Sequence, residues 1–210
     1  MLREVTPGSP AGDIKVGEIQ PLSAGHPKPA LVTERLSQVS DVASKAGHSL
    51  YQEMFFTCAV KRVADLLGSS CIYVEIVVDR DSGVSFAKVY SSRNAANAVD
   101  ILATRVLPFF RRQGVAIKEI HTRKAPEYCG LTPVHAYEAF LAEEHIRHLP
   151  TEHFGPSCNH ICKEFYRHLL KNFFPAALRR KFPLSLSDLQ KDLDAFVEAY
   201  NATPIGHRFL

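Results

Sequence analysis

The stretch that decides the fold is Lys118-Glu119-Ile120-His121-Thr122-Arg123-Lys124-Ala125-Pro126-Glu127-Tyr128-Cys129-Gly130. The residues Ala116–His121 predict a short β-strand, and the polar residues and Pro126 that follow predict a loop at the end of that strand. This loop places a cationic side chain, Arg123, four residues before the carboxylate of Glu127. Arg123 is therefore the first residue whose role needs an explanation.

Three earlier segments predict an antiparallel sheet. Ser49–Arg62 has the apolar content of a strand, and Cys71–Val78 is an apolar, β-branched run that ends in a turn signal at residues 79–83. Val84–Tyr90 alternates like the return strand of a hairpin. We therefore expect three consecutive antiparallel strands.

The second half of the chain alternates predicted helices and strands. Asn94–Gln113 has apolar residues at helical spacing and stops before Gly114, with a kink expected at Pro108. Ser187 and Gln190 have the spacing of a capping box for the last helix. The other predicted elements are helix Pro133–Glu144, strand His145–Leu149, helix Asn159–Phe173 and helix Asp188–Tyr200. This order predicts an α/β fold with a mixed sheet.

Composition divides the chain into three parts. Residues 1–45 are rich in proline and glycine, show little periodicity and predict a flexible arm. Residues 46–205 predict one globular domain, because 46% hydrophobic and 22% charged residues are typical of globular proteins. Residues 206–210 are a C-terminal tail.

Charge and cysteine content narrow the class of protein. The net charge of +3 is too small to indicate nucleic-acid binding by itself. Glu75 and Asp79 interrupt the longest apolar region, so no membrane span is predicted, and the N-terminus lacks the apolar stretch of a secretory signal. Five irregularly spaced cysteines do not suggest a disulfide framework. We therefore expect an intracellular protein, cytoplasmic or nuclear.

Several stretches resemble the integrase core of the DDE transposase and retroviral integrase superfamily, and insertion-sequence transposases in particular. Thr122, Glu127, Tyr128, Cys129 and Gly130 keep the frame of its Thr-Asp-Asn-Gly and Glu-Phe/Tyr-Cys-Gly motif. The other similar segments, in order, are Val77–Tyr90, Asn94–Phe110, Gly155–Asn159, Phe165–Leu170 and Leu186–Asn201. The resemblance covers most of residues 46–205 and implies a ribonuclease-H-like α/β fold, with a mixed five-stranded sheet flanked by helices.

The resemblance also implies where a metal site would lie. Active relatives hold two Mg²⁺ ions between an Asp on the first strand, an Asp at the end of the fourth strand and a Glu on a helix. The matching positions here are Glu53, Arg123 and Lys163. Because two fixed cations repel Mg²⁺, we expect no bound metal, no cofactor and no catalytic residues. We expect an ion-pair cluster at these positions instead.

Neighbouring acidic residues do not restore this triad. Glu164 is adjacent to Lys163, but one step along a helix turns a side chain by about 100°. Glu127 matches a Glu that active relatives already have beside their Asp. Asp79 and Asp81 lie in the predicted hairpin turn, away from the ligand position on the first strand.

Two cysteine-containing groups suggest other chemistry. The group that invites a zinc interpretation consists of Cys158, His160, Cys162 and His168, with His153 nearby. Its spacing matches no standard zinc finger, so we interpret these residues as packing residues. Cys129 would act as a nucleophile only beside a histidine, and the superfamily gives this cysteine no catalytic role.

Basic residues form the remaining candidate site. Those near the degenerate triad are Arg123, Lys124, Lys163, Arg167, Lys171, Arg179, Arg180 and Lys181. Together they suggest a surface that follows the phosphates of DNA or RNA. The alternative is that each cluster is only the solvated face of a helix.

The sequence leads to three hypotheses about function. The first is a catalytically inactive, transposase-derived integrase-core protein that binds nucleic acid or an unknown protein partner, and that forms a homodimer as the resemblance implies. The second is an active DDE recombinase that performs metal-dependent DNA strand transfer with differently placed acids. The third is a non-functional relic that still folds.

Overall fold

The computed structural model describes residues 46–57, 72–130, 135–151, 160–177, 179 and 185–203. The expected arm (1–45), the tail (206–210), Arg180 and Lys181 lie outside these ranges. The elements are β1 Ser49–Phe56, β2 Tyr73–Asp79, β3 Ser85–Tyr90, α4 Ala95–Ile101, η2 Leu102–Val106, α5 Leu107–Arg112, β4 Glu119–Arg123, α6 Ala136–Glu143, β5 Arg147–Thr151, α7 His160–His168, η3 Leu169–Phe173, α8 Phe174–Ala177 and α9 Leu186–Ala202, where η marks a π-helical turn. None of these helices is long and apolar enough to cross a membrane.

The strands form one five-stranded sheet in the order β3-β2-β1-β4-β5. β1 pairs with β2 and β2 with β3 in antiparallel fashion, whereas β1–β4 and β4–β5 are parallel. The parallel strands need crossover connections, which α4–α5 and α6 provide. The predicted antiparallel trio and the mixed sheet are both confirmed.

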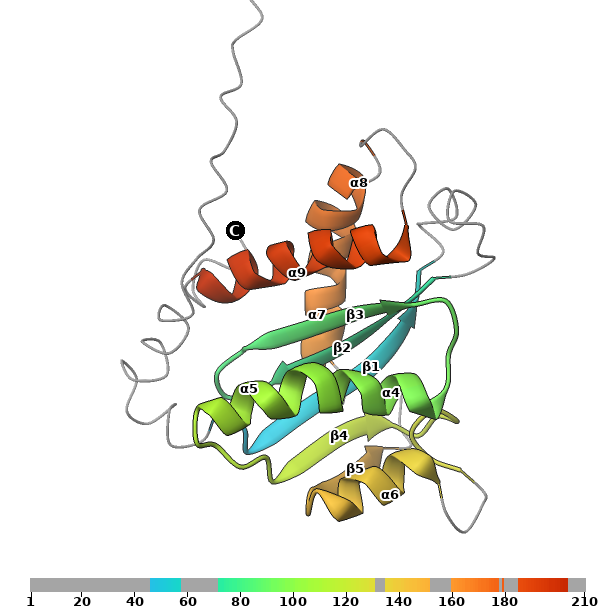
Figure 1. Ribbon diagram of the computed structural model, residues 1–210, viewed down its shortest axis with the longest axis vertical. Helices are drawn as coiled ribbons and strands as arrows, with labels where there is room; N and C mark the ends of the chain where they lie inside the picture. Colours follow the sequence, from blue (N-terminus) through green and yellow to red (C-terminus); the bar gives the residue numbers. More distant parts are fainter. Residues whose placement is uncertain are drawn as a thin grey trace, which may run out of the picture.

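Helices cover both faces of the sheet (Figure 1). Side chains alternate between the faces along each strand. Leu50 and Val77 therefore pack in one apolar cluster with α4, α5 and α6, while Val74 and Ile76 pack in a second cluster with α7 and α9. The sheet thus separates two apolar cores, and the polar residues of the candidate site lie on its strands.

The helical segments α4–α5 and α7–α8 each contain a π-helical turn before a proline. Leu102–Val106 precedes Pro108 in the first helix, and Leu169–Phe173 stands in the same relation to Pro175. Proline has no N–H and cannot continue the ordinary helical hydrogen bonds. The irregularity expected at Pro108 is therefore a π turn just before it, and Gly114 ends this helix with a φ of 68°.

Several strand boundaries differ from those predicted, among them β5, which spans Arg147–Thr151 and not His145–Leu149. β1 ends at Phe56, where its pairing with β2 begins, rather than at Arg62. β4 starts later than expected and continues to Arg123, because Arg123 still pairs with Thr151 of β5. Arg123 is therefore the last residue of a strand and does not belong to the following loop.

Helix α9 closes the free edge of β3. Asn201 accepts a hydrogen bond from the Ser85 N–H (2.9 Å) and donates one to the Ser85 carbonyl (2.8 Å). Gln190 accepts from the Val89 N–H (2.8 Å) and donates to the Ala87 carbonyl (3.4 Å). Side chains thus satisfy backbone groups that no neighbouring strand reaches.

The cap of α9 is not the predicted one. The pair Ser187 and Gln190 was expected to form the capping box. In the structure Ser185 is the N-cap, its Oγ accepts from the Asp188 N–H (3.0 Å), and the Asp188 carboxylate accepts from the Ser185 N–H (3.3 Å). Gln190 is engaged at the edge of β3 instead, so the helix begins two residues earlier than predicted.

Replacing Ser185 by alanine should destabilise the domain by about 1 kcal/mol, since the N-cap would lose its side-chain acceptor. The matched control is Ser187→Ala, an exposed serine inside the first turn, which should change the free energy of unfolding by less than about 0.5 kcal/mol. Urea denaturation followed by circular dichroism measures both. Equal effects of the two substitutions would show that the cap is assigned to the wrong serine.

Candidate functional site

The first part of the site lies on two neighbouring strands. β1 and β4 pair in parallel with Gln52 opposite Thr122, so the next residues, Glu53 and Arg123, lie side by side. Nη1 of Arg123 is 3.9 Å from Oε1 of Glu53. The Glu53 side chain is 5% exposed and that of Arg123 34%, so this ion pair spans the boundary between core and solvent.

Lys163, the third expected position, lies on α7, which packs against β1. The Cys162 thiol donates to the Tyr51 carbonyl at 3.3 Å and joins the two elements. Burial raises the pKa of this thiol well above its usual value, and the nearby charges of Glu53 and Lys163 act on it as well. The structure thus brings the three positions to the same face of the sheet.

β4 carries further polar side chains on this face. Glu119 forms an ion pair with Arg147 of β5 and accepts a hydrogen bond from Ser49 (3.1 Å). It also accepts one from His121 (3.1 Å) when Nε2 of that histidine carries the proton. The hydrogen bond from Arg147 is the main reason that the pKa of Glu119 falls to about 2. The His121 ring stacks on Tyr51 with 4.6 Å between centroids. The Glu119 and His121 side chains, on the same face as Arg123, are thus held by hydrogen bonds and are only partly buried.

A buried polar network lies on the opposite face of the sheet. The Gln52 amide donates to Glu75 (2.8 Å) and to the Ala98 carbonyl (2.9 Å), Tyr128 donates to Glu75 (2.7 Å), and Tyr137 donates to Gln52 (2.7 Å). Burial raises the pKa of Glu75 to about 8. The network therefore holds a carboxylic acid that is mainly protonated at neutral pH, and a protonated carboxylic acid is a poor metal ligand.

Sequence reasoning missed this network. Glu75 was visible as the acid that interrupts an apolar run, and an isolated acid in a buried strand needs a partner. The partners could not be named, because Tyr128 is 53 residues away and Gln52 is 23 residues away in the chain.

The other acids near the site have structural partners. Glu127, whose side chain is 1% exposed, forms an ion pair of 2.6 Å with Arg93, and this hydrogen bond raises the pKa of Arg93. Asp79 accepts from the backbone N–H groups of Gly47 (3.2 Å) and Ser82 (3.1 Å) and thereby holds the hairpin turn. Both carboxylates are used in holding the fold together.

The basic candidates are distributed over β4 and α7–η3. Lys124 is exposed at the end of β4, while Lys163 is half-buried and Arg167 and Lys171 are exposed at four-residue spacing along the helix. Arg179 is also exposed. Among the basic candidates that the structure describes, none is buried, which leaves each accessible to a polyanion.

The cysteine and histidine group on α7 does not come together. Cys162 is fully buried in the core, His168 packs against Phe196 and Tyr200, and His160 pairs with Glu164 at 2.9 Å. Cys158 and His153 lie outside the described residues. For the described members, the packing interpretation matches their surroundings.

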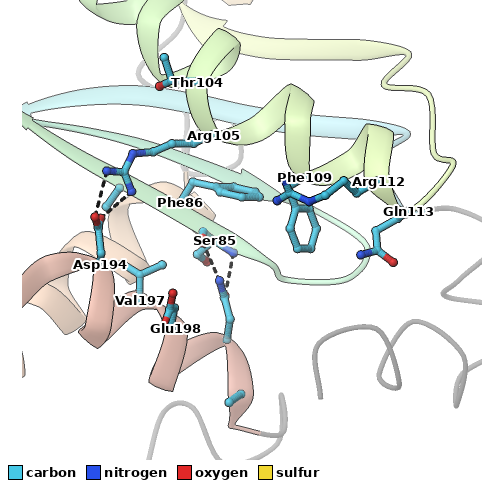
Figure 2. A pocket seen from close by; sticks show the side chains of 13 residues that line it. Ser85, Phe86, Thr104, Arg105, Phe109, Arg112, Gln113, Asp194, Val197 and Glu198 are labelled. Atoms are coloured by element: carbon cyan, nitrogen blue, oxygen red, sulfur yellow. Dashed lines mark hydrogen bonds and ion pairs between the residues drawn. The ribbon is translucent and has the colours of Figure 1, made fainter. Parts of the chain in front are cut away.

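One cavity is lined by residues other than Glu53 and Arg123. It has a volume of about 410 Å³ and lies between β3, α5 and α9 (Figure 2). Phe86 and Phe109 form its apolar wall, and Arg105 bridges to Asp194 with contacts of 2.5 and 3.1 Å. None of the predicted site residues lines this cavity.

Comparisons with known proteins show the fold. No family model and no curated protein sequence matches the chain. The catalytic core domain of BIV integrase is similar in structure, with 13% sequence identity and a TM-score of 0.52, over 76% of this chain and 88% of that one. A chain of the simian T-cell lymphotropic virus intasome in complex with PP2A regulatory subunit B56 gamma gives 14% identity and a TM-score of 0.51.

The latter match covers 70% of this chain and 47% of the intasome chain, so this chain spans about half the length of that protein. At these identities the similarity establishes the architecture alone. The domain has the ribonuclease-H-like fold of integrase catalytic cores, as the sequence predicted.

The change in the free energy of unfolding with pH tests the protonation of Glu75 in the buried network. Because the folded-state pKa of Glu75, about 8, lies above its usual 4.5, its contribution to stability is complete below the lower value and is lost as pH rises through the higher one. Glu75→Gln keeps the acceptor oxygen without the ionisation. Relative to this variant, the wild type should lose at least about 1.4 kcal/mol, the equivalent of one pKa unit, across that window.

Urea denaturation of both proteins at several pH values measures this difference. The difference between the two free energies of unfolding cancels the contributions of other titrating groups, which the proteins share. Parallel pH profiles would mean that Glu75 does not titrate in this window.

Proposed function

We propose that this chain is an integrase-core-like protein that has lost metal-dependent strand transfer and acts by binding nucleic acid. The observation that carries the first half is the ion pair between Arg123 and Glu53 at 3.9 Å. The second half is supported by the accessible basic side chains of α7–η3, because α7 packs against β1, the strand of Glu53.

The ion pair is incompatible with two-metal chemistry. Two divalent ions need several carboxylate oxygens at a strand end and on a facing helix. Here the guanidinium of Arg123 stands beside the carboxylate of Glu53, and the facing helix contributes the ammonium of Lys163. These cations compensate the Glu53 charge and repel an incoming Mg²⁺ ion.

The neighbouring acids do not offer a replacement set. Glu75 lies on the other face and is protonated at neutral pH, Glu127 is paired with Arg93, and Asp79 holds the hairpin turn. Glu119, on the correct face, is bound by Arg147. Each of these carboxylates would have to give up a partner before it could hold a metal.

The same substitutions favour binding to a polyanion. Acids need Mg²⁺ before a phosphate can approach them, but this face carries basic side chains instead. They are Arg123 at the end of β4 and Lys163, Arg167 and Lys171 along α7–η3. Cations at spacing four lie on one side of a helix. Such a row neutralises successive phosphates without reading bases, so the binding should depend strongly on salt.

The wild-type protein should show no saturable Mg²⁺ or Mn²⁺ binding at Glu53, because the local charge is already compensated. Isothermal titration of the wild type and Glu53→Ala, together with nicking of supercoiled DNA in Mn²⁺, provides the measurement. Saturable heat that disappears in Glu53→Ala, or nicking that does so, would support an active recombinase and refute the loss of chemistry.

Nucleic-acid binding should weaken with salt in proportion to the phosphates contacted. For the double variant Arg167→Ala, Lys171→Ala, the slope of log K against log salt on duplex DNA should decrease by about 2, roughly 0.9 per lost contact. The matched control is Arg80→Ala, an exposed arginine in the hairpin turn. Fluorescence anisotropy measures both, and an equal loss per removed charge in the control variant would assign the affinity to net charge alone.

A further inference from the structure

Three metal-ligating side chains from separate segments meet next to the loop that follows β4. They are Cys129 in that loop, Glu138 on α6 and His148 on β5. One ligand atom from each lies within 4.8 Å of the others. Among the described residues, this is the group with such a geometry. It includes neither Glu53 nor Cys162 of α7.

His148 is oriented toward this group. Its Nε2 is 2.8 Å from Thr122 Oγ1, which fixes the ring on β4. Its Nδ1 is buried without a hydrogen-bond partner within the described part of the chain, and the nearest carboxylate oxygen, of Glu138, is 3.7 Å away. The side chain is only 10% exposed. A buried polar atom that lacks a partner costs free energy and indicates a missing ligand.

The partner of Nε2 also suits metal binding. When Nε2 carries the proton and donates to Thr122, Nδ1 presents its lone pair to Glu138 and Cys129. Metal-bound histidines commonly have their second ring nitrogen held by such an outer hydrogen bond. Nδ1 of His148 is therefore available to bind a metal ion.

His135, one turn before Glu138, repeats this pattern. Its Nε2 lies 3.0 Å from the Pro126 carbonyl, and its Nδ1 is buried without a hydrogen bond to any described residue. It is the residue before α6 and gives the helix no side-chain cap. His135 does not belong to the group of three ligand atoms that lie within 4.8 Å of one another.

We propose that Cys129, Glu138 and His148 bind one zinc ion. Sulfur, nitrogen and oxygen donors together suit Zn²⁺, whereas Mg²⁺ takes oxygen ligands. Ligands of a tetrahedral zinc ion lie about 3.5 Å apart, so small side-chain rotations close the present distances. Burial raises the pKa of the Cys129 thiol, and a bound cation reverses this effect because a coordinating thiol is deprotonated.

The ion would join the loop after Arg123 to α6 and β5. This role is structural and does not depend on the proposed function, and it revises the expectation that the chain binds no metal. Little in the sequence indicates this metal site, because Cys129, Glu138 and His148 are separated by nine and ten residues and resemble no finger motif.

The test uses the full chain, freed of metal with a chelator and then loaded with Zn²⁺ or Co²⁺. We expect one ion per chain by elemental analysis after gel filtration, a rise in Tm with Zn²⁺, and the thiolate charge-transfer and tetrahedral bands of Co²⁺. Cys129→Ser should remove the charge-transfer band, and Cys129→Ser and Glu138→Gln should each weaken binding at least about tenfold.

His160→Ala is the matched control, because His160 is an exposed imidazole paired with Glu164 outside the group. It should leave binding unchanged. Glu138→Gln changes an exposed side chain and keeps the protein folded, so the result does not depend on a disruptive variant. Failure to retain zinc, or a cobalt charge-transfer band that survives in Cys129→Ser, would overturn the proposal.

Discussion

The buried network and the ion pair of Glu53 with Arg123 both depend on the register of β1, the strand between β2 and β4. Its even-numbered Gln52 turns to one face and meets Glu75 and Tyr137, and its odd-numbered Glu53 turns to the other and meets Arg123. A slip of one residue in one direction would place the Glu53 carboxylate in the network and Met54 beside the guanidinium. A slip in the other direction would place the Gln52 amide beside the guanidinium. The two apolar clusters and the network fix this register from both faces at once.

The buried network that stabilises the scaffold and the ion pair of Glu53 with Arg123 lie on opposite faces of the sheet. The network of Gln52, Glu75, Tyr128 and Tyr137 ties β1, β2, the loop after β4 and α6 together with hydrogen bonds that need no metal ion. On the other face, Arg123 supplies to Glu53 the positive charge that a divalent ion would bring. Under our proposal, acids could therefore be replaced by cations while the architecture persisted.

The sequence predicts elements better than their ends. Alternation and turn residues identify β2, β3 and the hairpin between them, because both signals are local. The cap of α9 was assigned wrongly since Ser187 and Gln190 fit a local pattern, whereas Gln190 is engaged by β3, about a hundred residues away. Arg123 was placed in a loop because only its pairing with Thr151 reveals that the strand continues. Long-range partners of this kind carry no signal in a single sequence.

The side chains of Gln190 and Asn201 along β3 have a consequence for association between molecules. An uncovered edge strand is a template on which another chain can add a strand, leading to aggregation. Here amide groups from α9 already bond the N–H and carbonyl of Ser85, the carbonyl of Ala87 and the N–H of Val89. At the opposite edge Pro150 interrupts β5 with a residue that has no N–H to donate. Self-assembly of this domain should therefore proceed through helix faces and not by extension of its sheet.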